Sequence, residues 1–351
     1  MDKIRGVWIP STDSDFFDSR QKIENGIRLL ADTGFNYIFP VVWNRGYTLY
    51  PSRVMHQLIH NSAGGEIAPA LMGRDPLQEI IDSAQRYNIK VVPWFEYGFT
   101  SSYQQNGGRL LAQRPDWAAR DKDGNLAKKN GFEWMNALDR NVQDFLLSLM
   151  LEVVQRYDVD GVQGDDRLPA LPSIGGYDAQ TKQRYRTETG QEPPNHPHDP
   201  AWLKWRSAIL TDFLARLTQT IKAVKPSLII SMAPSPYPFG YKEYLQDYPT
   251  WMQHDLVDFL HPQLYRRQVS AYTSLLKEVL KPFQPNHKAK LMPGVLVRSG
   301  DYRIAPDDLW QCIQYNRKMG LQGEVLFFFE QLSYNNGELA KFLQKKWYTQ
   351  C

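Results

Sequence analysis

"VDGVQGDDR" (residues 159–167) is a short apolar run, punctuated by glycine, that ends on two adjacent carboxylates and an arginine. Its length and composition are typical of a buried strand. Polar residues directly after such a strand either cap the next element or take part in chemistry. All runs of this kind are apolar at odd and even positions, as parallel strands covered on both faces are. The others lie at residues 4–10, 35–43, 89–98, 228–234, 257–265, 290–297 and 323–330.

Helical patterns lie between these runs. At residues 75–87, Asp75 is a predicted N-cap and Pro76 occupies the first helical position. Eight strands alternating with eight helices predict one α/β domain over residues 1–351, a (β/α)8 TIM barrel. A doubly wound sheet is the alternative, but it does not require this regularity. The other predicted helices cover residues 19–32, 139–157, 200–224, 242–255, 270–281, 306–319 and 336–346.

The connections between the predicted elements are long at one end of the barrel. Three strand-to-helix connections are long, at residues 44–74, 99–138 and 166–199. The helix-to-strand connections are mostly short, and residues 281–287 are the exception. Strand-to-helix loops build the active sites of such barrels, so we expect the functional site at this end.

The overall composition excludes several classes of protein. The net charge of +3 comes with scattered basic residues, so no nucleic-acid surface is expected. No apolar run is long enough to predict a membrane span. Cys312 and Cys351 form no disulfide framework, and His196 and His198 in "NHPHDP" are too few for a metal site, so no metal or cofactor is predicted. A strand-like start at Ile4 predicts a cytoplasmic protein, or a trimmed form of an exported one. No pattern predicts an oligomeric state.

Acidic and aromatic residues follow the predicted strands directly. Four carboxylates therefore converge on one mouth of the barrel, namely Glu96, Asp165, Asp166 and Glu330. Glycosidic bond cleavage needs one carboxyl group as proton donor and another as nucleophile or base, and sugar rings stack on Trp and Tyr. The pattern therefore predicts a glycoside hydrolase with a carbohydrate substrate. The candidate substrate-binding residues are Asp166, Trp43, Asn44, Arg45, Trp94, Tyr97, Arg167, His261, Gln263 and Tyr265.

The alternation of side chains along the strand at 159–165 separates the two aspartates. Gly161, Gln163 and Asp165 share one face. If this face points to the barrel axis, Asp165 does so at the rim and Asp166 lies to the side. We expect Asp165 to be the nucleophile or base, and Glu330 or Glu96 to be the acid.

Each candidate also has a structural interpretation, and the whole protein has two other possible functions. The first is a carbohydrate-binding barrel without catalysis. The second is a barrel enzyme that acts on phosphorylated metabolites, with a phosphate site near Gly300. The structural interpretations are a helix cap or partners of Arg167 for Asp165 and Asp166, a salt bridge to Arg45 for Glu96, a helix-start charge for Glu330, and a hydrogen-bonded strand residue for His261.

The motif at 159–167 resembles the fourth-strand signature of the bacterial glycosyl-hydrolase-like family 10, which reads VDG followed by an acidic pair. The resemblance spans nearly the whole chain in order. It rests further on "RGVWIPSTDSDFF" (5–17), "LLADTGFNYIFPVVWNRGYTLYPSRV" (29–54), "DPLQEIIDSAQRYNIKVVPWFEYG" (75–98), "RPDWAARDKDGN" (114–125), "VDFLHPQLY" (257–265) and "GEVLFFFEQL" (323–332).

This resemblance implies a (β/α)8 glycoside hydrolase. Some members of the family resemble hydrolases of peptidoglycan glycan strands, which implies a periplasmic or extracellular protein if the chain is a trimmed form. The resemblance also implies that the acidic pair, Gln263, Tyr265 and Glu330 match family positions. Three features depart from the pattern: Arg167 replaces a common Tyr, Glu96 stands where many members have Asn, and Phe329-Glu330 is shifted from an acid-acid pattern.

Overall fold

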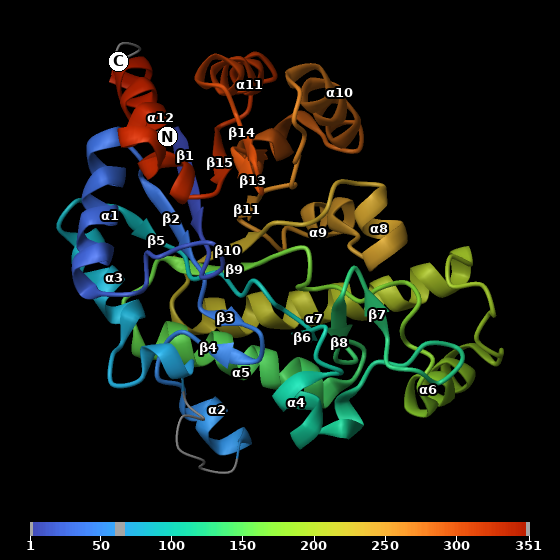
Figure 1. Ribbon diagram of the computed structural model, residues 1–351. Helices are drawn as coiled ribbons and strands as arrows, with labels where there is room; N and C mark the ends of the chain where they lie inside the picture. The colour runs from blue at the N-terminus through green and yellow to red at the C-terminus, as the bar shows by residue number, and fades with distance from the viewer. Residues whose placement is uncertain (1–2, 60–66, 349–351) are drawn as a thin grey trace.

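A computed structural model, drawn in Figure 1, describes residues 3–59 and 67–348. Within them, eight parallel strands pair in two ladders that bridges join into a closed ring. The ladders run in the orders β12-β15-β1-β2-β5 and β9-β10-β11. Parallel bridges from Trp94 to Gln163 and from Gln263 to Gly294 join the two sheets, which confirms the predicted (β/α)8 barrel. The strands are β1 (Ile4–Ile9), β2 (Tyr37–Pro40), β5 (Lys90–Val91), β9 (Gly161–Gly164), β10 (Ile229–Met232), β11 (Phe259–Leu260), β12 (Gly294–Leu296) and β15 (Gly323–Phe327).

All eight barrel strands are shorter than the predicted runs, and β5 and β11 are the shortest, at two residues each. Regular pairing of β5 ends at Val91, and β11 ends at Leu260. Pro93 and Pro262 lie just beyond, and proline has no backbone N–H for the ladder. The chain nevertheless continues along the barrel, since Trp94 N donates to Pro40 O at 2.8 Å.

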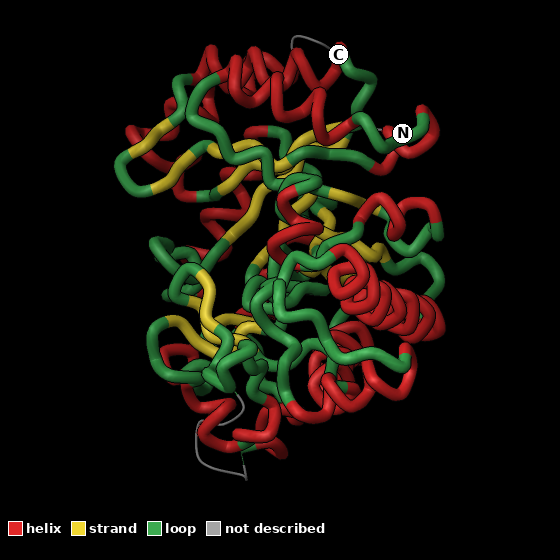
Figure 2. Tube along the Cα trace, turned by 90° about the vertical axis from the view of Figure 1, so that its right-hand side faces the viewer, coloured by secondary structure: helices red, strands yellow, loops and turns green. Residues whose placement is uncertain are grey.

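Helices surround the strands, which run through the interior of the molecule (Figure 2). Asp75 caps α3 by accepting from Gln78 N, and Pro76 follows it, as predicted. The predicted helix at 242–255 is instead two short helices, because Leu245 adopts a left-handed conformation with φ of 61° and ends the first. The helices are α1 (Arg20–Thr33), α2 (Arg53–Leu58), α3 (Pro76–Gln85), α4 (Gly108–Gln113), α5 (Arg140–Arg156), α6 (Ala179–Thr189), α7 (Pro200–Val224), α8 (Phe239–Tyr244), α9 (Tyr248–Gln253), α10 (Val269–Leu280), α11 (Pro306–Lys318) and α12 (Glu330–Tyr348, with non-helical angles at Tyr334–Gly337).

The long strand-to-helix connections carry small antiparallel sheets and single turns of 3-10 helix. Buried Glu133 holds one of these connections together by accepting from Gln105 N, Asn106 N and Gly107 N. These hydrogen bonds keep the pKa of Glu133 low, at about 2. The added strands are β3 (Trp43–Asn44), β4 (Tyr47–Thr48), β6 (Thr100–Tyr103), β7 (Lys128–Lys129), β8 (Phe132–Trp134), β13 (Arg298–Ser299) and β14 (Tyr302–Arg303), and the 3-10 turns are η1 (Pro69–Leu71) and η2 (Pro115–Trp117). A further 3-10 segment, η3 (Pro285–Lys290), lies in the helix-to-strand connection between α10 and β12.

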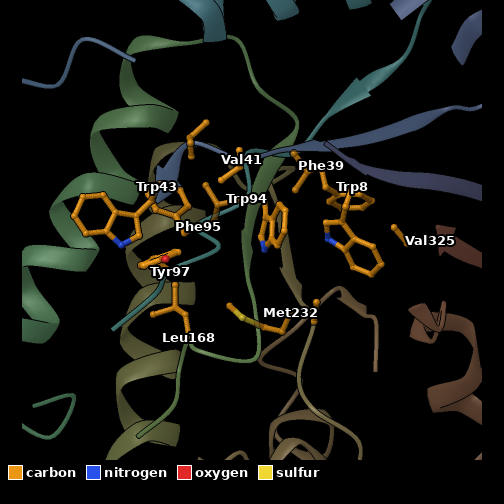
Figure 3. Close-up of a cluster of buried hydrophobic side chains, with 14 of the residues drawn as sticks. Trp8, Phe39, Val41, Trp43, Trp94, Phe95, Tyr97, Leu168, Met232 and Val325 are labelled. Carbon is orange, nitrogen blue, oxygen red and sulfur yellow. The ribbon is translucent and has the colours of Figure 1, made fainter. Parts of the chain in front are cut away.

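A chain of polar contacts crosses the inside of the barrel. Trp8 Nε1 donates to Gln163 Oε1 at 2.6 Å, and Gln163 Nε2 donates to Ser231 Oγ at 2.8 Å. The indole of Trp8 also packs on Phe39, with ring centroids 6.0 Å apart (Figure 3). Buried polar groups are stable when each finds a partner, and this chain fixes the face of β9 that points to the axis.

The described residues, 3–59 and 67–348, can be compared with the predictions about membrane spans, metal ions and cysteines. No helix in them combines the length and apolar character that crossing a membrane requires. No group of three or more His, Cys, Asp or Glu side chains within them is arranged to hold a metal ion. Cys312 is a buried free thiol, whereas Cys351 lies outside the described residues.

Candidate active site

Arg167 lies at the centre of three carboxyl groups at the C-terminal end of the barrel. Its Nη1 is 3.2 Å from Asp166 Oδ1, and its Nη2 is 3.5 Å from Asp165 Oδ2 and 3.8 Å from Glu96 Oε1. The Asp165–Asp166 pair therefore contacts Arg167, one of the two structural alternatives, and neither aspartate caps a helix, since Asp178 caps α6. Within the described residues, Glu96 forms its ion pair with Arg167 and not with Arg45, which the structural interpretation had named.

The two aspartates lie at different depths. Asp165 accepts a hydrogen bond from Trp94 Nε1 at 2.9 Å and is 2% exposed. Its Oδ1 is buried and finds no hydrogen-bond partner within the described residues. The side chains of Asp166 and Glu96 are 25% and 16% exposed, respectively. The carboxyl groups that a substrate can reach are thus those of Asp166 and Glu96, with Asp165 beneath them.

Burial controls the protonation of this cluster. It raises the pKa of Asp165 well above the ordinary value, and the neighbouring Asp166 charge adds to the effect, whereas Arg167 opposes it. Burial also raises the pKa of Glu96, against the Arg167 charge and a hydrogen bond from Asn44 Nδ2. The three carboxyl groups cannot all be charged at low energy, so the cluster retains a proton more readily than isolated carboxylates would.

Glu330 has a separate environment. It begins α12, so the helix-start alternative describes its position, and it is 8% exposed. Both of its carboxyl oxygens are buried without a hydrogen-bond partner in the described residues. Burial raises the pKa of Glu330 to about 7, while Ser14 and Arg298 act in the opposite direction. Arg167 forms no ion pair with Glu330 within the described residues, so the predicted acids do not form one cluster.

The predicted aromatic residues Trp43, Trp94 and Tyr97 are all buried. Trp94 lies inside the barrel beside Trp8, with ring centroids 6.4 Å apart, whereas Trp43 lies apart from them (Figure 3). The Trp43 indole is fully buried, donates to Gly98 O at 3.0 Å and packs on Phe145 of α5. Its position favours a supporting role over the expected contact with sugar. Tyr97 is also buried, 5.6 Å from the Arg167 guanidinium.

The residues that follow β11 differ in burial. Both ring nitrogens of His261 are occupied, by Met292 O at 2.8 Å and Ser231 Oγ at 3.0 Å, and the side chain is fully buried. This position favours the hydrogen-bonded strand residue over the predicted substrate contact. Burial lowers the pKa of His261 to about 4. Tyr265 is half-buried and stacks on Phe327 at 4.8 Å, and Gln263 Nε2 donates to Ala233 O at 2.9 Å.

Asn44 and Arg45 border a cavity of about 330 Å³ beside the carboxyl cluster. Arg45 is exposed and has a φ of 51°. Hydroxyl groups, apolar side chains and the carboxyl group of Asp18 form the rest of the wall, so the cavity offers hydrogen bonds and apolar contact together. The remaining lining residues are Ser11, Thr12, Ser14, Phe17, Asp18, Tyr47, Leu49, Ala68, Ala70 and Leu71.

The comparisons with known proteins identify the family. The model of the family Glycosyl hydrolase-like 10 matches residues 3–305. The chain belongs to this family.

Two relatives at low sequence identity are also named glycosyl hydrolases. The Glycosyl hydrolase DigH of Escherichia coli (strain K12) is 24% identical over 367 residues, which cover 91% of this chain and 77% of DigH. The Glycosyl hydrolase YngK of Bacillus subtilis (strain 168) is 22% identical over 381 residues, which cover 95% of this chain and 69% of YngK.

Two solved structures show the same fold. The PgaB (BpsB) glycoside hydrolase domain from Bordetella bronchiseptica matches with a TM-score of 0.71 and 12% identity, covering 98% of each chain. The catalytic domain of a β-amylase from Paenibacillus polymyxa matches with a TM-score of 0.68 and 12% identity, covering 99% of this chain and 98% of that one. At these identities the likeness concerns the fold alone.

Two contacts in this Glycosyl hydrolase-like 10 site were not predicted from the sequence. The Phe132 ring lies 4.6 Å from the Arg167 guanidinium, and Gln246 Nε2 donates to the backbone O of Asp165 at 3.2 Å. Phe132 lies in the long strand-to-helix connection at residues 99–138, whereas Gln246 lies between α8 and α9, within the helix predicted at 242–255. The length of the first connection was the available signal for Phe132, but it does not indicate which of its side chains reach the mouth, and no signal indicated Gln246.

Proposed function

We propose that this protein hydrolyses O-glycosidic bonds of a glycan. One observation carries the proposal: Asp166 and Glu96, both partly exposed, contact one guanidinium at the mouth of a barrel. Glycoside hydrolysis requires such a pair of carboxyl groups. The family membership and the glycoside hydrolases among the structural neighbours support the same reaction.

Exposure and protonation suggest the roles of the two groups. Glu96, whose pKa is raised, would protonate the leaving oxygen, as the sequence allowed. Asp166, held in its ion pair with Arg167, would act as nucleophile or as base toward water. Asp165, first expected in that second role, would act beneath the pair as a positioning residue. Glu330 is a weaker candidate for the acid, because both of its oxygens are buried.

The substrate that we propose is a polysaccharide, and specifically a peptidoglycan glycan strand. The cavity beside Asn44 has about the volume that one substituted sugar unit needs. The exposed guanidinium of Arg45 at this cavity would favour a sugar that carries an anionic group. The resemblance of the family to peptidoglycan hydrolases supports this choice, whereas the relatives' names specify only glycosyl hydrolases.

Single amide substitutions test the reaction. Purified glycan strands are incubated with Glu96→Gln, Asp166→Asn and Asp165→Asn proteins, and new reducing ends are counted. We expect kcat to fall by about 10²- to 10⁴-fold for Glu96→Gln and Asp166→Asn, because each removes a proton donor or a nucleophile. Glu330→Gln is expected to cost at most about tenfold, since the group lies away from the exposed pair.

Two exposed carboxylates serve as matched controls. Asp158 precedes β9 and is 75% exposed, and Glu278 lies on α10 and is 57% exposed. Asp158→Asn and Glu278→Gln should leave kcat unchanged. Folded Glu96→Gln and Asp166→Asn proteins with wild-type turnover would contradict the proposed reaction. Isothermal titration with the same glycans then tests binding without catalysis.

A further inference from the structure

Contacts other than those with the carboxyl groups hold Arg167 in place, at its side chain and at its backbone. Its Nε donates to Glu96 O at 2.9 Å, and its guanidinium lies 4.6 Å from the Phe132 ring centroid. At the other end, its backbone O accepts from Phe99 N at 3.0 Å. An arginine held in this way can present its remaining N–H groups in fixed directions.

We propose that Arg167 is the positioning residue of this site: it holds Asp165, Asp166 and Glu96 around one guanidinium and sets the charge of the pair that faces the glycan. This inference rests on the proposed hydrolysis for its kinetic consequences, but its structural part can be tested alone. Arg167 would act through the carboxyl groups, because its side chain is only 12% exposed.

The geometry requires an arginine specifically. The guanidinium contacts Asp166 through Nη1, Asp165 and Glu96 through Nη2, and a backbone carbonyl through Nε. A lysine carries its charge on one nitrogen, so it cannot reach all of these partners from one position. Lysine would keep the positive charge but lose the arrangement, and glutamine would lose both.

The charges around Arg167 determine the direction in which the pH–rate profile moves when this arginine is removed. Arg167 lowers the pKa of Asp165 and of Glu96, against their burial. Without this guanidinium, both carboxyl groups would keep their protons to higher pH. Arg45 also lowers the pKa of Glu96. The alkaline limb of a bell-shaped pH profile, which the proposed acid Glu96 sets, would therefore move toward higher pH. The titratable and charged groups that face this centre are Glu96, Tyr97, Arg45, Asp165, Asp166, Tyr244 and Tyr265.

The first experiment compares Arg167→Gln and Arg167→Lys in pH–rate profiles on glycan strands. We expect the optimum of Arg167→Gln to rise by about one pH unit or more, with kcat reduced at least tenfold and KM changed less. Arg167→Lys should keep the wild-type optimum but lose kcat, because it keeps the charge without the geometry. An unchanged optimum in Arg167→Gln, or full kcat in Arg167→Lys, would overturn the proposal.

Arg216 offers a matched control. It is also partly buried, pairs with Asp144, donates to Gln143 Oε1 at 2.9 Å and lies 5.6 Å from the Phe213 ring, but it joins α5 to α7 away from the mouth. Arg216→Gln should lose stability without any shift of the pH optimum. A shift of equal size in this variant would show that the effect is merely structural.

A second experiment needs no activity and so separates this inference from the proposed reaction. Unfolding is measured from pH 4 to pH 8 for the wild type, for Arg167→Gln and for Arg167→Lys. The wild type should exceed Arg167→Gln in stability by a margin that grows with pH, since the guanidinium has charged partners only when the carboxyl groups are ionised. The margin should shrink when Asp166→Asn is added to both proteins. A margin that does not change with pH would overturn the inference, even if no glycan is hydrolysed.

Discussion

Trp94 Nε1 donates a hydrogen bond of 2.9 Å to Asp165 Oδ2, and this bond ties the third barrel strand to the buried aspartate of the fourth. The backbone of Trp94 also bridges to Gln163, so the indole and the aspartate are held by the same strand register. The other oxygen of Asp165 has no such partner within the described residues. Trp94 therefore sets the orientation of the carboxyl group that lies under Asp166 and Glu96.

Replacing Trp94 with Phe should disturb this orientation. The Trp94→Phe protein loses the hydrogen bond and leaves the buried Asp165 Oδ2 with its 3.5 Å contact to Arg167 Nη2, which costs about 1 to 3 kcal/mol in the free energy of unfolding. Because the lost bond favoured the charged form, the pKa of Asp165 should rise further. We expect kcat to fall about tenfold, as measured by reducing-end release.

Trp251→Phe is the control for that change. Trp251 is fully buried and donates to Thr211 Oγ1 at 3.3 Å, but it lies on α9. It should lose comparable stability and keep its kcat. Equal kcat values for the Trp94→Phe and wild-type proteins would contradict the role given to Trp94.

Gly98 allows the backbone of Arg167 to approach closely. Its φ is +47°, and a Cβ atom at this position would lie 2.2 Å from Arg167 O. Gly98→Ala must therefore move Arg167 away from its carboxyl partners, so we expect at least a tenfold loss of kcat and about 2 to 4 kcal/mol of stability. Gly124→Ala is the control. Gly124 has a φ of +84°, and nothing lies within 4 Å of the added Cβ, so this substitution should cost only the backbone strain, about 1 kcal/mol of stability. Similar kcat values for the two variants would argue against the close approach as the cause.

The sequence predicted the barrel and the end at which its polar residues gather, because both follow from local patterns. The alternation of apolar strands and helices predicted the fold, and the alternation along 161–165 placed Gln163 and Asp165 on one face, which the contact of Gln163 with Trp8 shows to be the inner one. Depth was not predictable. Asp165 is buried because other residues lie over it, and Arg167 is one of them. Phe132 and Glu96, which come from distant parts of the chain, hold Arg167 in this position.

Trp43 and Glu96 illustrate the same limit. An aromatic residue at a strand end can face the mouth or the surrounding helices, and the chain enters the β3–β4 hairpin at Trp43, which places the indole against Phe145. Two of the three departures from the resemblance, Glu96 and Arg167, are partners at 3.8 Å. A negative and a positive residue that replace two neutral ones can compensate each other, but only the folded chain shows that they meet.

His261 should make the protein sensitive to acid. Its pKa is about 4 in the folded state and 6.5 ordinarily, because burial disfavours the charged ring. The stability that the neutral ring provides is fully present above pH 6.5 and is lost as the pH falls toward 4, by on the order of 3 kcal/mol. His261→Gln removes this titration, so its unfolding free energy should fall less between pH 6.5 and pH 4. Parallel pH dependences for the two proteins would contradict a neutral, buried His261 ring.

Glu330 should have the opposite dependence on pH. Its pKa is raised to about 7 in the folded protein, against an ordinary value of 4.5, because both oxygens are buried without hydrogen-bond partners in the described residues. The proton stabilises the folded state below pH 4.5, and this contribution is lost as the pH rises through 7. Glu330→Gln carries a permanently neutral group of similar shape, so it should match the wild type at pH 4.5 and exceed its stability at pH 8 by up to about 3 kcal/mol. Urea unfolding at the two pH values measures the difference, and Glu278→Gln, a substitution of an exposed residue, should show no such gain. If Glu330→Gln is less stable than the wild type at pH 8, the carboxylate has a charged partner there and the buried, protonated group inferred from the structure is wrong.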